Sequence, residues 1–278
     1  MLRHAVVGVD FSPSSEALVA CLGELRTLGT EVLTLVYVAS VAYPGGSAIG
    51  HEAHYRERLQ GLAEALSAHG FEVHTDVVVG YPAAELVATA ERVGATLIVI
   101  GSRGESLVER WFLGSTAMDV VARAPVAVML VRIEPTSPEA CAAVCARAFA
   151  RVLLATDLSA AAEGATRVAL DLAETAEAFA IVSVLDAPSD ADEATVRAQV
   201  RRLADERGVP ATIHVVSGAR ASEHIAVVAE AEDMGVVVVG RRGHGALHDR
   251  LIGSTAEAVA RRGEVSVLMV PDHPRDPR

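Results

Sequence analysis

The chain has 278 residues, of which 51% are hydrophobic and 22% charged; this length suggests about two domains, and the composition excludes a mostly disordered chain. No apolar run approaches the roughly 20 residues of a membrane helix, and the N-terminal run 5–9 is too short for a signal peptide, so we expect a cytoplasmic protein with no membrane partner. The net charge of −12 is shared as −6 in each half (9 − 15 over 1–134 and 15 − 21 over 135–278), which disfavours nucleic acid as a partner.

Short β-branched apolar runs alternate with helical patterns in the first half of the chain. We expect strands over 6–9, 32–38, 72–78, 97–100 and 126–131, and helices over 14–28, 52–69, 83–93 and 115–123. Ser12 and Pro13 are suited to the start of the first helix, as cap and first residue. Gly29 and Gly70 stand where a helix commonly ends on glycine.

The second half repeats this pattern after a linker. We expect a domain over 1–134, a linker over 135–150 with a short helix over 139–148, and a second domain over 151–278. The second domain is predicted to contain strands over 152–155, 180–185, 212–216, 236–239 and 265–270, with helices over 160–176, 191–207, 222–232 and 254–261. Strands that alternate with helices predict a doubly wound, mostly parallel α/β sheet in each domain.

Two motifs recur in both halves. Each first strand ends in Asp-x-Ser, at Asp10–Ser12 and at Asp157–Ser159. Each fourth strand runs into a glycine-rich segment of the form G-x2-G-x9-G-S. Its members are Gly101, Gly104, Gly114 and Ser115 in the first copy and Gly240, Gly243, Gly253 and Ser254 in the second.

The glycine-rich segment suits an anionic ligand. Glycines allow an anion to approach main-chain N–H groups closely, and the last glycine with Ser-Thr opens a helix whose first N–H groups have no helical partner. Ligands of doubly wound sheets bind at the carboxyl ends of the strands, where these segments stand. Tight turns without a ligand are the structural alternative for the glycines, and capping of the first helix is the alternative for Asp10 and Asp157.

With these motifs in both copies, the sequence resembles the universal stress protein family in its tandem form. The resemblance implies two Rossmann-like (adenine nucleotide alpha hydrolase-like) domains, each a five-stranded parallel-type sheet with helices on both faces. It also implies ATP, accompanied by Mg²⁺ through the phosphates, at the strand ends; AMP or cyclic AMP is the alternative ligand. It further implies pairing of the two domains through their last strands, and we expect a homodimer of such chains.

The resemblance assigns residues as follows. Asp10 and Asp157, with Ser12 and Ser159, would lie near the ribose and adenine. Val38 and Val184 would pack on the adenine. The phosphates would be held by Gly101, Arg103, Gly104, Gly114, Ser115 and Thr116 in the first copy, and by Gly240, Arg242, Gly243, Gly253, Ser254 and Thr255 in the second.

The charges of the two glycine-rich segments differ. Residues 101–116 carry two arginines and two glutamates, whereas residues 240–255 carry Arg241, Arg242 and Arg250 against Asp249, a balance of +2. Because arginine forms strong charge-assisted bonds with phosphate, one hypothesis is that the second site binds triphosphate more tightly. The alternative is that these side chains are solvated and contribute little. His244 and His248 are spaced as a metal pair would be on a helix, but no acidic third ligand is near.

Residue types that are missing limit the chemistry. Lysine is absent, which excludes a lysine Schiff base and the G-x4-G-K-[ST] phosphate loop. Cys21, Cys141 and Cys145 give no disulfide framework, which suits a reducing compartment. Cys141 and Cys145 would share a helix face, as small apolar residues or as a redox pair.

Three functions fit these observations. The first is a nucleotide-binding regulatory protein of the stress response, with an unidentified protein partner. The second is a slow ATPase or adenylating enzyme, for which no catalytic residue is assigned because no general base or second carboxylate recurs near the glycine segments. The third is a scaffold that does not use nucleotide, against which the two intact glycine patterns argue.

Overall fold

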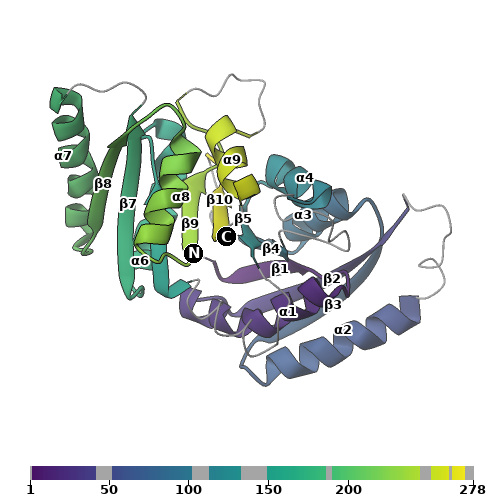
Figure 1. The fold of residues 1–278 in the computed structure, drawn as a ribbon. Helices are drawn as coiled ribbons and strands as arrows, with labels where there is room; N and C mark the ends of the chain where they lie inside the picture. Colours follow the sequence, from purple (N-terminus) through teal and green to yellow (C-terminus); the bar gives the residue numbers. More distant parts are fainter. Residues whose placement is uncertain are drawn as a thin grey trace. The chain divides into compact units, whose positions relative to one another are not determined.

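The structure is a computed structural model of the chain, and it describes residues 2–41, 52–101, 113–132, 149–185, 190–244, 252–262 and 265–272. The chain divides into two compact units, one of residues 1–145 with 275–278 and one of residues 146–274. Each unit is an α/β sheet with helices (Figure 1). The expected domain limits at 134 and 151 remain predictions, and the expected helix over 139–148 lies outside the described residues.

The first unit contains five parallel strands in the order β3-β2-β1-β4-β5. The strands are β1 (His4–Gly8), β2 (Val32–Ser40), β3 (Glu72–Gly80), β4 (Leu97–Gly101) and β5 (Ala127–Val131), and the helices are α1 (Pro13–Cys21), the 3-10 helix η1 (Leu22–Leu28), α2 (Glu52–Ser67), α3 (Pro82–Arg92) and α4 (Ser115–Arg123). The chain moves outward from β1 to β3 and then returns to β4 on the other side of β1. Right-handed crossovers therefore put α1 and α2 on one face of the sheet and α3 and α4 on the other, as Figure 1 shows.

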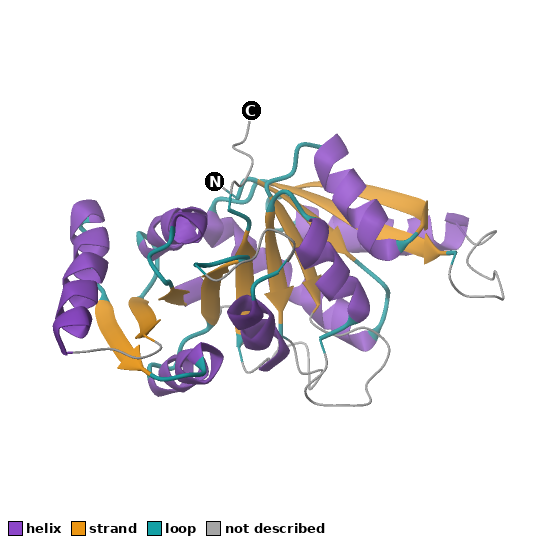
Figure 2. Cartoon of the chain, turned by 90° about the horizontal axis from the view of Figure 1, so that it is seen from above, coloured by secondary structure: helices purple, strands orange, loops and turns teal. Residues whose placement is uncertain are grey.

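The second unit repeats this topology, with the strand order β10-β9-β6-β7-β8 and parallel pairing throughout. Its strands are β6 (Arg151–Ala155), β7 (Ala178–Leu185), β8 (Thr212–Ser217), β9 (Val236–Gly240) and β10 (Ser266–Val270), and its helices are the 3-10 helix η2 (Ala160–Ala162), α6 (Glu163–Ala173), α7 (Asp190–Arg207), α8 (Ala221–Ala231) and α9 (Ser254–Arg262). Strands flanked by helices are visible in Figure 2. The predicted doubly wound fold is confirmed in both units.

The central strands form the core of each unit. In β1 the side chains of Ala5, Val6 and Val7 are fully buried, and in β6 the same holds for Val152, Leu153 and Leu154. Continuous apolar runs are what a strand covered by helices on both faces requires. The apolar residues of β4 and β9 are buried as well, so the residues that follow these strands begin at the core of each unit.

Two sequence expectations about helices need correction. The first helix of each unit is divided: α1 gives way to η1 after Cys21, and η2 precedes α6. Apolar periodicity is similar in the two helix types, so the sequence pattern did not separate them. Gly29 ends η1 with a left-handed φ of 78°, and Gly70 follows α2 with a φ of 86°.

The cysteines were expected to give no disulfide framework, but Cys21, buried at the end of α1, is disulfide-bonded. Cys141 and Cys145 lie outside the described residues.

Candidate functional site

The turn after β1 places the Asp10 carboxylate at the carboxyl end of the sheet. Asp10 Oδ1 accepts hydrogen bonds from the backbone N–H of Ser12 (2.9 Å) and from Ser12 Oγ (2.6 Å). Ser12 Oγ in turn accepts from the N–H of Ser15 (3.2 Å) and so caps α1, with Pro13 as the first helical residue. The expected cap is confirmed for Ser12, while Asp10 supports the cap and keeps its second oxygen, Oδ2, outside these bonds.

The turn after β6 has the same backbone form, but Ser159 Oγ does not cap the helix that follows and has no hydrogen-bond partner among the described residues. Asp157 Oδ1 accepts from the backbone N–H of Ser159 (3.0 Å), and Thr156 Oγ1 accepts from the N–H of Leu158 (3.1 Å). The middle residue of each turn has left-handed backbone, with a φ of 59° at Phe11 and 60° at Leu158. For a bulky residue this conformation costs about 1–2 kcal/mol. Strain at the same position in both copies points to a functional turn.

The residues directly after β9 contact the ends of two further elements. Arg241 N–H donates to the carbonyl of Val270 in β10 (2.7 Å), and the Arg241 carbonyl accepts from the N–H of Gly253 (2.8 Å), directly before α9. A Cβ on Gly240 would lie 2.9 Å from the backbone oxygen of Arg242. Residues 241–243 therefore lie between the end of β10 and the residue that precedes α9.

Gly243 brings this loop against the aspartate of the neighbouring strand. Asp157 Oδ2 accepts a hydrogen bond from the backbone N–H of His244 (2.7 Å), and the His244 ring Nδ1 lies 3.5 Å from the same oxygen. A Cβ on Gly243 would collide with Asp157 Oδ2. The two motifs recognised separately in the sequence thus meet at the switch point between β6 and β9.

These contacts act on the pKa of Asp157. Burial by itself would raise the pKa of this carboxyl, but the hydrogen bonds from the backbone N–H groups of His244 and Ser159, together with attraction to the His244 ring, lower it from 3.8. Asp157 is therefore a carboxylate at neutral pH. Its Oδ2 already accepts the hydrogen bond of the His244 N–H, which directly follows Gly243.

The charge count over residues 240–255 leaves out a carboxylate that the structure places beside Arg242. Asp272, which follows β10 and lies outside the counted segment, accepts from Arg242 Nε (2.8 Å) and lies 2.6 Å from Arg242 Nη2. Burial lowers the pKa of the Arg241 guanidinium, an effect that Asp272 opposes and Arg242 reinforces. The hypothesis of tighter triphosphate binding by the second unit loses the support of the +2 count.

The other predicted phosphate residues lie at the strand and helix ends. Gly101 ends β4, and Gly114 precedes α4, with Ser115 and Thr116 in its exposed first turn. Ser254 and Thr255 open α9 in the same way. The first N–H groups of these helices have no intrahelical acceptor. Arg103 and Gly104 lie outside the described residues, as does His248.

Val38 and Val184 occupy matching places near the ends of β2 and β7, both half-buried. Their surroundings differ between the two units. In the first unit Phe11, Tyr37 and Tyr55 form an aromatic cluster with ring centroids 4.0 to 5.9 Å apart, and the Arg58 guanidinium lies 4.0 Å from the Phe11 ring centroid.

Sequence reasoning missed this cluster and also missed Asp272. Phe11 lies within the Asp-x-Ser motif and Tyr37 directly precedes Val38, so both were adjacent to predicted site residues. Leu158 and Ser183 stand at the matching places of the second unit. Asp272 carried no sequence signal, because its contact with Arg242 spans 30 residues.

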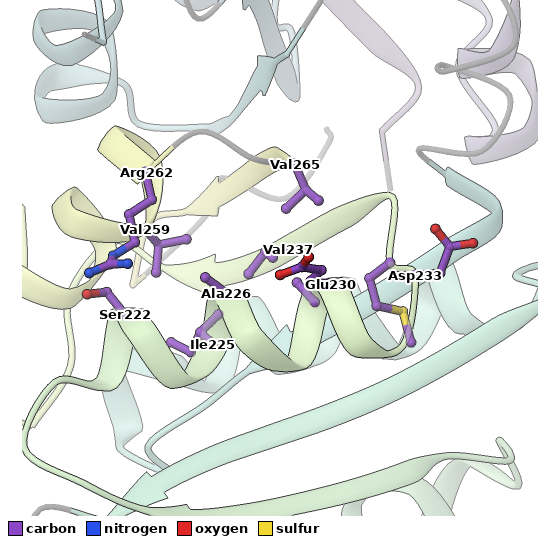
Figure 3. Close-up of a pocket in the computed structure, with 11 residues that line it drawn as sticks. Ser222, Ile225, Ala226, Glu230, Asp233, Val237, Val259, Arg262 and Val265 are labelled. Carbon is purple, nitrogen blue, oxygen red and sulfur yellow. The ribbon is translucent and has the colours of Figure 1, made fainter. Parts of the chain in front are cut away.

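A cavity of about 340 Å³ lies elsewhere in the second unit, between α8, β9 and α9 (Figure 3). Its lining is mainly apolar, with Ser222 and Arg262 at one end and Asp233 at the other, as Figure 3 shows. None of the predicted nucleotide residues lines it. The strand-end site is therefore built from main-chain donors and carboxylates rather than from this cavity.

Within the described parts of the chain, no group of three or more His, Cys, Asp or Glu side chains is arranged to hold a metal ion. Among the described helices, none is long and apolar enough to cross a membrane.

Comparison with known proteins agrees with this architecture, which defines a tandem protein of two doubly wound α/β domains. The profile of the universal stress protein family matches residues 1–132 and again residues 148–271. The chain belongs to the universal stress protein family and carries its domain twice.

Individual relatives and solved structures are similar to this chain to different extents. A universal stress protein of Mycolicibacterium smegmatis is 29% identical over 291 residues, which cover 95% of this chain and 96% of that protein. Universal stress protein MJ0531 of Methanocaldococcus jannaschii is 36% identical over 77 residues, 28% of this chain and 45% of that protein, so the match spans less than half of its length. The crystal structure of a universal stress protein from Archaeoglobus fulgidus DSM 4304 superposes with a TM-score of 0.82 at 23% identity and covers 98% of this chain and 99% of that one.

Proposed function

We propose that this protein binds an adenine nucleotide in each unit, with ATP as the ligand, and acts as a nucleotide-dependent regulator of the stress response. The observation that carries the proposal is the meeting of Asp157 with the glycine loop at the switch point between β6 and β9. Such switch points are where doubly wound sheets bind ligands. Asp10 after β1 and Gly101 at the end of β4 flank the matching point in the first unit.

The phosphates of the nucleotide would lie against the first turns of α4 and α9. These turns offer main-chain N–H groups, the positive end of the helix dipole and the hydroxyls of Ser115, Thr116, Ser254 and Thr255. No lysine is needed for such a site. The ribose and base would lie toward Asp10 and Val38 in the first unit and toward Asp157 and Val184 in the second.

A single negative charge in each first turn tests this proposal. Ser115→Asp or Ser254→Asp places a carboxylate where a phosphate would lie, and it favours the helix through the dipole. Each variant should therefore fold normally and lose one bound ATP. Gln60→Glu, on the exposed face of α2, adds the same charge away from both sites and serves as the control.

Native mass spectrometry counts the ATP molecules per chain, with and without Mg²⁺. Two ATP molecules in the parent chain and in Gln60→Glu, and one in each serine variant, would support the proposal. Bound AMP or cyclic AMP in place of ATP would make this a monophosphate sensor. No nucleotide at millimolar ATP would leave a scaffold function, and phosphate release during the same incubation would reveal slow hydrolysis.

Assembly and location belong to the proposal as well. We propose that the apolar last strands β5 and β10 mediate pairing of the two units and that two chains form a homodimer, which the mass of the native particle tests. A cytoplasmic location is proposed from the sequence. Because disulfides are uncommon in that compartment, the bonded Cys21 makes cell fractionation the necessary check.

A further inference from the structure

Two residues after β9, Arg242 and His244, each bind a carboxylate from a neighbouring strand end. Asp157, which follows β6, accepts from the backbone N–H of His244. Asp272, which follows β10, binds the guanidinium of Arg242. Strands β6 and β10 are the two neighbours of β9 in the sheet, so the loop is held from both directions across the end of its own strand.

Asp272 and Arg242 form a partly buried ion pair through one carboxylate oxygen, Oδ2, while Oδ1 has no hydrogen-bond partner among the described residues. The Asp272 side chain is only 13% exposed and that of Arg242 30%. Both Nε and Nη2 of Arg242 lie within 2.8 Å of the same carboxylate oxygen. Partly buried, charge-assisted hydrogen bonds are about twice as strong as neutral ones, whereas exposed ion pairs contribute little.

Fixing Arg242 fixes the main chain that borders the proposed phosphate site. The backbone of the preceding residue, Arg241, bonds to Val270 on one side and to Gly253 on the other. A Cβ on Gly253 would lie 3.5 Å from the Cα of Arg242. The backbone at Arg242 is thus packed against the residue that opens α9.

We propose that Asp272 is a positioning residue for the nucleotide site of the second unit: it holds Arg242, and through it the glycine loop, in place beside the start of α9. This inference rests on the proposed function. Arg242 then serves the loop rather than the phosphates directly, which differs from the role that the family resemblance implies for it.

The sequence of the first copy differs at the position that corresponds to Asp272. The family match ends at residue 271, one residue before Asp272. With the 139-residue offset between the glycine motifs, Arg103 corresponds to Arg242, but Ile133 stands in the sequence where Asp272 is expected. The first copy therefore has the arginine in its sequence without a carboxylate at the corresponding position.

The test uses the full chain with Ser115→Asp, so that only the second site binds ATP. Added to this background, Asp272→Ala should weaken ATP binding about tenfold, equivalent to about 1.4 kcal/mol. Asp272→Asn, which keeps an oxygen acceptor, should lie between. Without ligand, the N–H groups of Arg241 and Gly253 should exchange with deuterium faster in Asp272→Ala than in the parent.

Two controls separate positioning from general stability. Asp171→Asn removes a more exposed ion pair with Arg207 (2.9 Å) between α6 and α7 of the same unit, with the same change of charge, and should change neither ATP affinity nor the exchange of these two N–H groups. In an Arg242→Ala background, Asp272→Ala should have no further effect on ATP affinity, because the partner through which it acts is gone.

The outcomes are distinct. Unchanged or tighter ATP binding by Asp272→Ala, in a background that binds ATP, would overturn the role of Asp272 and leave the proposed function intact. A full additional loss in the Arg242→Ala background would overturn the route through Arg242. Failure of the parent chain to bind any nucleotide would overturn the proposed function and this inference with it.

Discussion

Gly243 is the position where the site can be perturbed by a single methyl group. In Gly243→Ala the new Cβ would collide with Asp157 Oδ2. The colliding atom is the end of a side chain, so the aspartate can rotate away, but it then loses the hydrogen bond from His244 N–H (2.7 Å). The cost of the substitution is therefore mainly the cost of that bond.

The magnitude follows from the exposure of the two partners. A hydrogen bond to a charged group contributes about 1.5–3 kcal/mol, and the 39% exposure of the Asp157 side chain favours the lower end, about 1.5 kcal/mol, because solvent screens the charge. Where it causes no backbone strain, replacing glycine by alanine stabilises the folded protein by about 0.5 kcal/mol, because it lowers the conformational entropy of the unfolded chain. Gly243→Ala should therefore destabilise the second unit by about 1 kcal/mol, or roughly 4 °C in its melting temperature.

A double-mutant cycle decides whether this reasoning holds. In an Asp157→Ala background the collision partner is absent, so Gly243→Ala should become stabilising by about 0.5 kcal/mol. Urea unfolding, combined with hydrogen exchange to resolve the second unit, measures both values. Gly253→Ala is the control, since its Cβ would lie in ordinary contact 3.4 Å from the Arg241 carbonyl oxygen. Equal destabilisation by Gly243→Ala in both backgrounds would refute the proposed collision.

Three further substitutions test the two strand-end turns. The folded-state pKa of Asp157 is lowered from 3.8, so its contribution to stability is present above about pH 4 and is lost as the pH falls through the folded pKa. Asp157→Asn should remove this part of the acid sensitivity, measured by unfolding between pH 3 and 7. An unchanged acid profile in the variant would contradict this prediction. Leu158→Gly should be about 1 kcal/mol more stable than Leu158→Ala, since both lose the side chain but only glycine is relieved of the left-handed strain; equal stability in thermal unfolding would argue that the turn is unstrained. Arg58→Ala removes the guanidinium above the Phe11 ring and an exposed ion pair, and it should lower the free energy of unfolding in urea by about 1 kcal/mol. Arg56→Ala on the same helix is the control and should lower it less. The reverse order would exclude the ring contact as the cause.

The two proposed sites differ in what surrounds the strand ends. The first has an aromatic cluster on the β2 side, and the second has two carboxylates that tie its glycine loop. We expect these differences to give the two units unequal nucleotide affinities. The direction is no longer given by the count of arginines, because Asp272 balances one of them.

The sequence by itself determined the fold class and the repeat. Apolar strand runs, and the glycine or serine residues at the ends of elements, are local signals. For this reason β1 to β10 were predicted with limits within about two residues of those observed. The two Asp-x-Ser motifs and the two glycine motifs were likewise found at the correct strand ends. The sequence did not separate the α-helix α1 from the 3-10 helix η1, because both have a similar apolar periodicity.

Only the tertiary structure decided which of the predicted residues touch. The bond between Asp157 and His244 spans 87 residues and that between Arg242 and Asp272 spans 30; both arise because strand order places β6 and β10 on either side of β9. Adding up charges within one segment left out Asp272, since this carboxylate follows a neighbouring strand and is close to Arg242 in space but distant in sequence. The positions of strand ends follow from local pattern, whereas the pairing of side chains across them follows from topology.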